Sequence, residues 1–242
     1  MQNYKLVLSY DGTEFCGWQR QPATRTVQGS LEEALARIAG KKITVIGAGR
    51  TDAGVHAAGQ VANFKVNLRL KEGELIRALN SLLPDDVRVI RLQKVDLNFN
   101  ARKMAKSKIY QYRIFNSPDI SPFLLRYVLH WPSPLQVKLM KEAAALFIRE
   151  ADFTAFSSNR LLHPVRKVFF SRIEKKKEEI IYTIEANGFL RYMVRTIVGT
   201  LLEVGRGKMP VSRIEEIFRE KKRSLAGATA PAKGLCLVKV IY

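Results

Sequence analysis

The feature that most constrains the fold is the order in which strand-like and helix-like stretches alternate in the first half of the chain. Short β-rich runs, bounded by turn residues, alternate with runs whose apolar residues recur at helical spacing. Strands are predicted at residues 5–10, 43–46, 61–66 and 87–95, and helices at residues 27–38 and 75–83. Thr26 is a candidate N-cap of the first helix, and Gly40 is its stop signal. This order of elements is that of the split βαβ, or ferredoxin-like, unit.

The second half of the chain repeats this order with additions. Strands are predicted at residues 108–115, 165–173, 179–186 and 236–241, and helices at residues 137–148, 189–204 and 211–222. Two irregular segments, residues 116–132 and 154–164, have no counterpart in the first half, and long insertions on a compact scaffold are often functional. We therefore predict an α+β protein whose two ferredoxin-like (RRM-like) halves form a joined, mainly antiparallel sheet with helices on one side. The predicted domains are residues 1–104 and residues 105–242.

The charge of the chain narrows the kinds of partner it can have. Lys and Arg number 41 against 22 Asp and Glu, which gives a net charge of +19 spread along the chain. A distributed basic surface favours a polyanion partner, most simply nucleic acid. A membrane surface is disfavoured because no basic helix has a clean apolar face, and no apolar run reaches membrane-spanning length. The two distant cysteines, Cys16 and Cys236, indicate neither a zinc site nor a disulfide framework, so we expect a soluble protein of a reducing compartment.

Residues 47–60 form a glycine-rich segment between two predicted strands, longer than a tight turn requires. Its four glycines permit unusual backbone angles and the close approach of a ligand. One cation (Arg50), one carboxylate (Asp52) and one imidazole (His56) lie within it. A loop that presents these groups is a candidate active site. The alternative for Asp52 is a solvated turn residue, which is the commoner role of a single Asp in a loop.

Hydrolytic chemistry does not suit the remaining residues. A metal-dependent nuclease needs clustered carboxylates or histidines. The adjacent acid pairs, Glu32-Glu33 on a predicted helix and Asp85-Asp86 in a turn, are better interpreted as solvated surface. No nucleophile elbow is present, and Gly47-Ala48-Gly49 is too short for a phosphate-binding loop. What remains is a carboxylate in a basic chain, and a lone Asp can act as nucleophile or base without metal or cofactor.

Several stretches of the chain, in the same order, resemble the tRNA pseudouridine synthase A (TruA) family. The most specific is GRTDAGVHAAGQVANF at residues 49–64. The others are YDGTEFCGWQRQP (10–22) with TVQGSLEEAL after it, KIYQYRIFN (108–116), NGFLRYMVRTIVGTLLEVGRGK (187–208) and ATAPAKGLCL (228–237). Together they extend along nearly the whole chain. Thr196 is a departure, because the family pattern has Asn after the Met-Val-Arg triplet, and this puts only a local contact in question.

The resemblance implies an isomerase that converts uridine to pseudouridine in the anticodon stem-loop of tRNA. It implies tRNA as the partner, no cofactor, no metal, a cytoplasmic homodimer and an active-site cleft between the two halves. On this basis Asp52 is the essential carboxylate, and Arg195 is the arginine that pairs with it. Tyr110 matches the tyrosine that packs on the flipped base and is a candidate to take a proton from its ring carbon. Arg50 lies where it can enter the space that the flipped base vacates.

Alternatives remain for each of these assignments. Asp52 could attack the base, attack the sugar or remove a sugar proton. Tyr110 and Tyr112 are two apart on one strand and face the same way, so both could simply be sheet aromatics. Arg195 lies off the apolar stripe of its helix and could be an exposed charge, and His56 is expected to be structural. For the whole chain, the alternatives are a non-catalytic RNA-binding protein or RNA chaperone on the same fold, and a synthase acting on another RNA such as ribosomal RNA.

Overall fold

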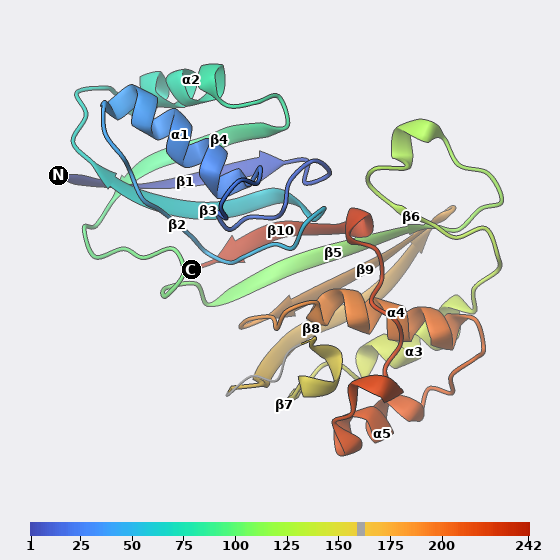
Figure 1. Ribbon diagram of the computed structural model, residues 1–242. Coiled ribbons are helices and arrows are strands. Elements are labelled where there is room, and N and C mark those ends of the chain that lie inside the picture. Colours follow the sequence, from blue (N-terminus) through green and yellow to red (C-terminus); the bar gives the residue numbers. More distant parts are fainter. Residues whose placement is uncertain (159–162) are drawn as a thin grey trace. The chain divides into compact units, whose positions relative to one another are not determined.

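A computed structural model describes residues 1–158 and 163–242 of the chain (Figure 1). The chain separates into two compact units, one formed by residues 1–106 with 237–242 and the other by residues 107–236. Both termini therefore belong to the first unit. Part of the second predicted insertion, residues 159–162, lies outside the described residues.

The first unit is a mainly antiparallel sheet with two helices. Its elements in chain order are β1 (Gln2–Tyr10), α1 (Val27–Ala39), β2 (Val45–Gly47), β3 (His56–Val66), α2 (Glu72–Leu82), β4 (Val87–Val95) and, mostly within this unit, β10 (Leu235–Ile241). The strands follow the order β4-β1-β3-β10, and β2 pairs with β3 at Ala62, Asn63 and Phe64. Both α1 and α2 lie on the same face of this sheet (Figure 1). The predicted α+β class and the strand and helix order of this half are confirmed.

Local sequence signals explain where α1 begins and ends. The side chain of Thr26 accepts a hydrogen bond from the Gly29 N–H at 3.2 Å, which satisfies one of the unpaired donors of the first turn. Gly40 ends the helix in the left-handed conformation with a φ of 67°. The alternating side chains of β1 bury Tyr4, Leu6 and Leu8 against the helices, as a half-buried strand requires.

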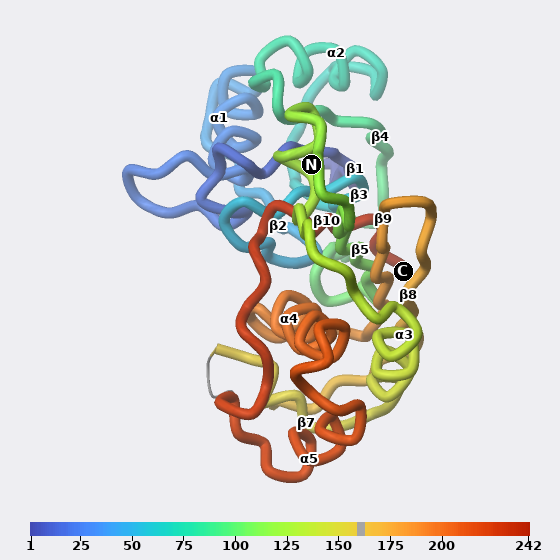
Figure 2. Tube along the Cα trace, turned by 90° about the vertical axis from the view of Figure 1, so that its right-hand side faces the viewer, coloured from blue at the N-terminus to red at the C-terminus, as the bar shows by residue number. Residues whose placement is uncertain are grey.

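In the second unit the strands follow the order β5-β9-β8-β7, and each neighbouring pair in this order is antiparallel. Its elements are β5 (Ser107–Phe115), β6 (Leu129–His130), α3 (Val137–Ala145), β7 (Glu150–Asp152), β8 (Val165–Lys176), β9 (Glu179–Ala186), α4 (Met193–Gly205) and α5 (Arg213–Glu220). Short 3₁₀ helices span Pro122–Leu124, Thr154–Phe156, Arg223–Leu225 and Ala232–Gly234. Helices α3 and α4 lie side by side in both views (Figures 1 and 2). None of the helices in the described residues has the length and apolar character needed to span a membrane.

The two largest errors in predicted boundaries are at the starts of β3 and α4. Strand β3 begins at His56 and not at residue 61, so the second part of the glycine-rich segment is strand and the connecting loop is residues 48–55. Helix α4 begins at Met193 and not at residue 189 because Tyr192 has a φ of 62°, which a right-handed helix cannot contain. In both places the apolar pattern is continuous across the boundary, so pattern alone does not locate it.

Candidate active site

The loop that carries Asp52, residues 48–55, is fixed at its start by two hydrogen bonds within the first unit. The Ala48 N–H donates to the Val61 carbonyl at 2.8 Å, and the Gln60 side-chain amide donates to the Gly49 carbonyl at 3.0 Å. A turn follows Asp52, closed by the Val55 N–H donating to the Asp52 carbonyl at 3.1 Å. Asp52 is half-buried and Arg50 is exposed, so the loop presents both charged groups at its surface from an ordered backbone.

A second loop, residues 11–26 between β1 and α1, packs against the Asp52 loop. The Trp18 N–H donates to the Thr51 carbonyl at 3.1 Å, and the Gly54 N–H donates to the Phe15 carbonyl at 3.2 Å. Gly17 has a φ of 89°, and a Cβ at this position would lie 2.6 Å from the Thr51 oxygen. Only glycine fits this backbone at that separation. The residues on both sides of Asp52 are therefore held by the loop at 11–26.

The side chain of Thr51 adds a third attachment next to Asp52. Its Oγ1 lies 2.8 Å from the hydroxyl of Tyr10, and both side chains are buried. No local sequence pattern marked Tyr10, Trp18 or Thr51 as residues that support the Asp52 loop. Their contacts join residues more than thirty positions apart in sequence, so a local pattern does not indicate them. The available signal was their position inside the two motifs that resemble the synthase family.

His56 connects the start of β3 to the loop at residues 11–26. Its Nδ1 accepts a hydrogen bond from the Gly12 N–H at 3.0 Å and lies 3.1 Å from a carboxylate oxygen of Asp11. The imidazole is 6% exposed, so little of it faces solvent. A Cβ on Gly12 would lie 2.1 Å from the Val55 oxygen, which shows how closely the two loops approach. These contacts favour a structural role for His56.

The two tyrosines of β5 lie in the second unit and are both buried. The ring of Tyr110 is 6% exposed and contacts Phe189 edge to face, with the ring centroids 5.1 Å apart. Tyr112 is fully buried, and its hydroxyl donates to the Pro231 carbonyl at 2.9 Å. Burial raises the pKa of Tyr112 far above its ordinary value, and the opposing effect of Arg195 is smaller. Tyr112 is therefore a neutral phenol whose proton belongs to a structural hydrogen bond.

Arg195 lies in the first turn of α4 and is half-buried, so it is not the fully exposed charge of the alternative interpretation. Its Nε donates to the Ala230 carbonyl at 2.7 Å, and the Ala230 N–H donates back to the Arg195 carbonyl at 3.1 Å. The guanidinium carbon lies 4.9 Å from the centroid of the Tyr192 ring. The backbone of the segment at residues 226–231 thus holds Arg195 in one orientation through these two hydrogen bonds.

Close packing of α4 makes this arrangement possible. A Cβ on Gly199 would lie 1.6 Å from the Ala228 oxygen, so the helix and the segment at 226–231 touch backbone to backbone. The Gly227 N–H donates to the Thr200 hydroxyl at 3.0 Å. Thr196, the departure from the family pattern, is buried with its hydroxyl 3.3 Å from that of Thr229. Thr196 therefore takes part in the local packing next to Arg195.

The predicted site residues fall into two groups. Arg50 and Asp52 belong to the first unit, and Tyr110 and Arg195 belong to the second. Within residues 1–158 and 163–242, no group of three or more His, Cys, Asp or Glu side chains is arranged to hold a metal ion. The chemical groups of the Asp52 loop and its contacts are thus one carboxylate, one arginine (Arg50), backbone amides and the hydroxyls of Thr51 and Tyr10.

Comparison with known proteins agrees with this description. A family model described as tRNA pseudouridine synthase matches residues 6–102 and 143–242. The tRNA pseudouridine synthase A of Thermodesulfovibrio yellowstonii is 44% identical over 254 residues, and those of Thermoanaerobacter sp. and Acetivibrio thermocellus are 45% and 43% identical over 244 residues. Each comparison covers 100% of both chains.

Among solved structures, a chain of the archaeal box H/ACA sRNP Nop10-Cbf5 complex matches with a TM-score of 0.32 and 12% identity. The match covers 91% of this chain and 59% of that one, and at this score it is not evidence of a shared fold. The family model and the relatives that match along the whole length carry the assignment. The chain belongs to the tRNA pseudouridine synthase family.

Proposed function

We propose that this protein converts uridine to pseudouridine in the anticodon stem-loop of tRNA, with Asp52 as the essential carboxylate. Membership of the family makes it an isomerase acting on tRNA uridine. The observation that supports Asp52 is the way its loop is built, with Thr51 held through both its carbonyl and its hydroxyl. A carboxylate fixed in this way needs little reorganisation when it reacts, which is how enzymes lower barriers through positioning.

The reaction rearranges one nucleotide without net change in composition. The bond from N1 of uracil to the sugar breaks, the base rotates, and a bond from C5 to the same sugar carbon forms. The proton at C5 is lost and N1 gains one, so atoms and electrons balance. A base cannot undergo this change inside a helix and must first leave the stack. Asp52 could assist by attacking the base, attacking the sugar or removing a sugar proton.

Tyr110, Arg195 and Arg50 complete the proposed catalytic and substrate-binding set. Tyr110 is the candidate to stack on the uracil ring and to accept the proton from C5, and its ordered ring beside Phe189 supports the stacking role. Arg195 is the cation proposed to keep Asp52 ionised, since an opposite charge favours the carboxylate form. Arg50 is exposed on the same loop as Asp52 and is proposed to fill the space of the flipped base.

The experiment that tests this function is to incubate the pure protein with unmodified tRNA transcripts, without added metal, and to map pseudouridine. We expect the modification in the anticodon stem-loop with the wild-type chain. Asp52→Asn should abolish it and leave tRNA binding nearly intact, because phosphate contacts dominate affinity. Asp119→Asn, an exposed acid on the insertion, is the matched control and should behave like the wild type.

Two results would contradict the proposal. Turnover by a pure Asp52→Asn sample would remove the catalytic role of this residue. Equal loss of tRNA binding and activity in the same variant would assign Asp52 a structural role. If the wild-type chain binds tRNA and forms no pseudouridine in any RNA, the non-catalytic RNA-binding alternative is correct.

We also propose that the protein is a cytoplasmic homodimer. The resemblance of its motifs to the synthase family supports the dimer, and the tRNA substrate and the absence of paired cysteines support the location. Sedimentation velocity at micromolar concentration tests the dimer directly. A species with the mass of a single 27.5 kDa chain at all concentrations would contradict it.

A further inference from the structure

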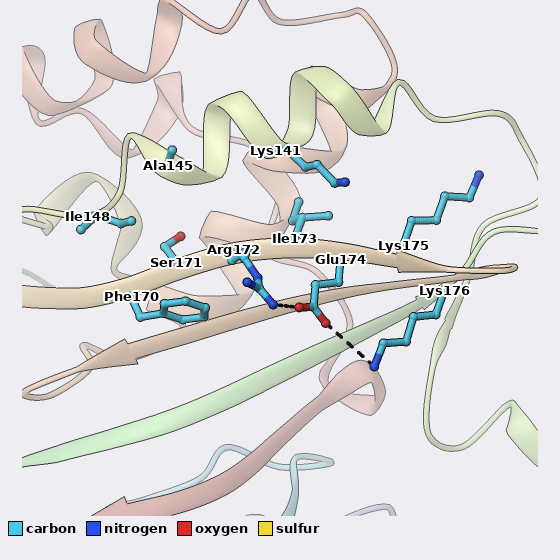
Figure 3. A pocket seen from close by; sticks show the side chains of 10 residues that line it. All are labelled: Lys141, Ala145, Ile148, Phe170, Ser171, Arg172, Ile173, Glu174, Lys175 and Lys176. Atoms are coloured by element: carbon cyan, nitrogen blue, oxygen red, sulfur yellow. Dashed lines mark ion pairs between the residues drawn. The ribbon is translucent and has the colours of Figure 1, made fainter.

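A groove of about 790 Å³ runs between α3 and the edge of β8 in the second unit (Figure 3). Side chains from α3 and the residues after it line one part of the groove. The side chains of β8 that line it alternate, with Ser171, Ile173 and Lys175 on the side toward α3 and the others on the opposite side, so the groove wraps around this strand (Figure 3). The role proposed for Asp52, Tyr110 and Arg195 does not use this groove. Strand β9 pairs with one side of β8, whereas the only strand pairing on the other side is with β7, at Val165, Arg166 and Lys167, within the described residues. The groove therefore follows a sheet edge.

The lining of the groove is strongly cationic. Its lining includes four cations and the single carboxylate of Glu174. Lys141 and Lys175 lie on the α3 side of β8, and Arg172 and Lys176 lie with Glu174 on the opposite side of this strand (Figure 3). Glu174 forms an ion pair with Arg172, and its other oxygen lies 3.9 Å from Lys176 Nζ. Among the described residues, no ion pair involves Lys141 or Lys175. The groove thus carries an excess of positive charge that an anionic ligand could neutralise.

Aromatic rings accompany these cations along β8. Phe169 is 46% exposed, with Lys167 Nζ 5.9 Å from its ring centroid. Phe170 lines the groove, and the Arg172 guanidinium carbon lies 5.6 Å from its centroid. Cations interleaved with accessible aromatic rings are typical of surfaces that bind a nucleic-acid backbone and stack on a base. This composition favours RNA over an acidic protein as the occupant.

The register of the sheet relates the groove to Tyr110. Tyr110 on β5 pairs with Ile184 on β9, and Ile184 pairs with Ser171 on β8, which lines the groove. Neighbouring strands lie about 4.8 Å apart, so the groove begins about 10 Å from Tyr110 in the same cross-strand row. An RNA stem-loop that offers a base to Tyr110 is large enough to reach this groove with its backbone.

We propose that the groove between α3 and β8 binds the phosphodiester backbone of the tRNA substrate, outside the uridine-binding site. The identity of the RNA rests on the proposed function, whereas the anion-binding character rests on the groove itself. A different explanation exists for the same lysines, because charged side chains on an edge strand prevent pairing with other chains. The two explanations differ in what happens to tRNA affinity when the charges are removed.

The test measures tRNA binding by filter retention over a range of salt concentrations, with the full-length chain. Lys141, Arg172, Lys175 and Lys176 are replaced together by Gln. We expect the slope of log Kd against log salt to fall by about three, and the affinity at low salt to fall at least about tenfold. The single-turnover rate at saturating tRNA should stay within about twofold of wild type, because binding energy that is uniform along the reaction does not alter the chemical step.

Two further variants keep the test decisive. The matched control replaces Lys41, Lys42, Arg69 and Lys103, which are exposed and outside the groove, so it removes the same charge with the same residue types. This control should lose markedly less affinity than the groove variant. Glu174→Gln has the opposite expected sign, since it removes the only carboxylate of the groove, and should tighten tRNA binding about twofold or more.

Unchanged tRNA affinity in the groove variant would overturn the proposal, as would equal losses in the groove and control variants. Self-association of the groove variant with unchanged affinity would instead establish edge protection. If the wild type forms no pseudouridine but the groove variant still loses tRNA affinity selectively, the proposed function fails and the groove inference stands.

Discussion

Tyr110 and Tyr112 lie on the same face of β5, yet their rings have different surroundings. The hydroxyl of Tyr112 is a fully buried donor to the Pro231 carbonyl, and the Tyr112 ring fills the space against Gly234, where a Cβ would lie 2.6 Å from it. Tyr110 contacts Phe189, directly before the region of α4 that carries Arg195. At the scale of residues, these contacts assign packing to Tyr112, and the chemical role of Tyr110 stays a prediction.

Tyr110→Phe tests the proposed proton transfer, because it keeps the stacking ring and removes the hydroxyl. General acid–base groups contribute about 10²–10⁴-fold, so the single-turnover rate should fall by that factor or more while the melting temperature changes little. Tyr112→Phe is the matched control. It should keep its rate but lose about 1 kcal/mol of stability, because the Pro231 carbonyl loses its donor. Near-normal turnover of Tyr110→Phe would show that the Tyr110 hydroxyl takes no part in proton transfer and that only its ring can contribute, by stacking.

At the scale of elements, helix α4 and the segment at residues 226–231 form one packed pair. Backbone contact at Gly199 brings Ala230 next to Arg195, which it binds through two hydrogen bonds. The orientation of the arginine thus depends on how closely the helix approaches the segment. The apolar periodicity of α4 indicates its buried face, whereas the partner of that face comes from nearly thirty residues further along the chain.

Gly199→Ala should separate this packed pair. The added methyl group has no space beside the Ala228 carbonyl, so we expect a loss of about 1–3 kcal/mol in the free energy of unfolding and a slower reaction through displaced Arg195. Chemical denaturation and single-turnover kinetics measure the two effects. Gly73→Ala in α2 is the control, since a Cβ there meets only Arg77 at 3.9 Å, and it should stabilise by about 0.4–1 kcal/mol. Equal stability of both variants would show that the close approach at Gly199 is not required.

At the scale of the whole molecule, the residues that could carry chemistry are few and the positive charge is large. The described residues offer no cluster of three metal-binding side chains, and the two cysteines are both free. The reaction is an isomerisation that needs neither an oxidant nor a reductant. Under the proposed function, binding of the RNA would depend on the basic surface and the chemistry on the Asp52 loop.

Removing metal ions with a chelator tests whether the chemical step, as distinct from RNA binding, needs a metal. With prefolded tRNA, the protein should retain its full single-turnover rate in EDTA, because Asp52 can act without a Lewis acid. Pseudouridine formation is measured with and without the chelator, after the tRNA has been folded and the free Mg²⁺ removed. Loss of activity that only a transition metal restores would contradict this chemistry. A partial loss of activity that Mg²⁺ restores would mean that Mg²⁺ acts by folding the tRNA. A melting curve of the RNA alone can verify this.

Features that depend on near neighbours in the chain could be predicted from the sequence. The period of apolar residues, the cap at Thr26 and the stop at Gly40 specify α1 because a helix closes its hydrogen bonds within four residues. The order of strands and helices followed from the same local signals. The motif around Asp52 also indicated the family, since residue types and spacing are enough for that comparison. The role of Asp52 as the essential carboxylate stays a prediction.

The distant residues that support these elements could be identified only from the fold. It joined Tyr10 to Thr51 and Trp18 to the same residue, started β3 at His56, and brought the end of the chain back into the first unit beside β3. These contacts depend on the shapes of surfaces that meet after the chain has folded, and no local period records them. For the same reason, the groove beside β8 was not visible in the sequence, where its lysines read only as part of a distributed charge.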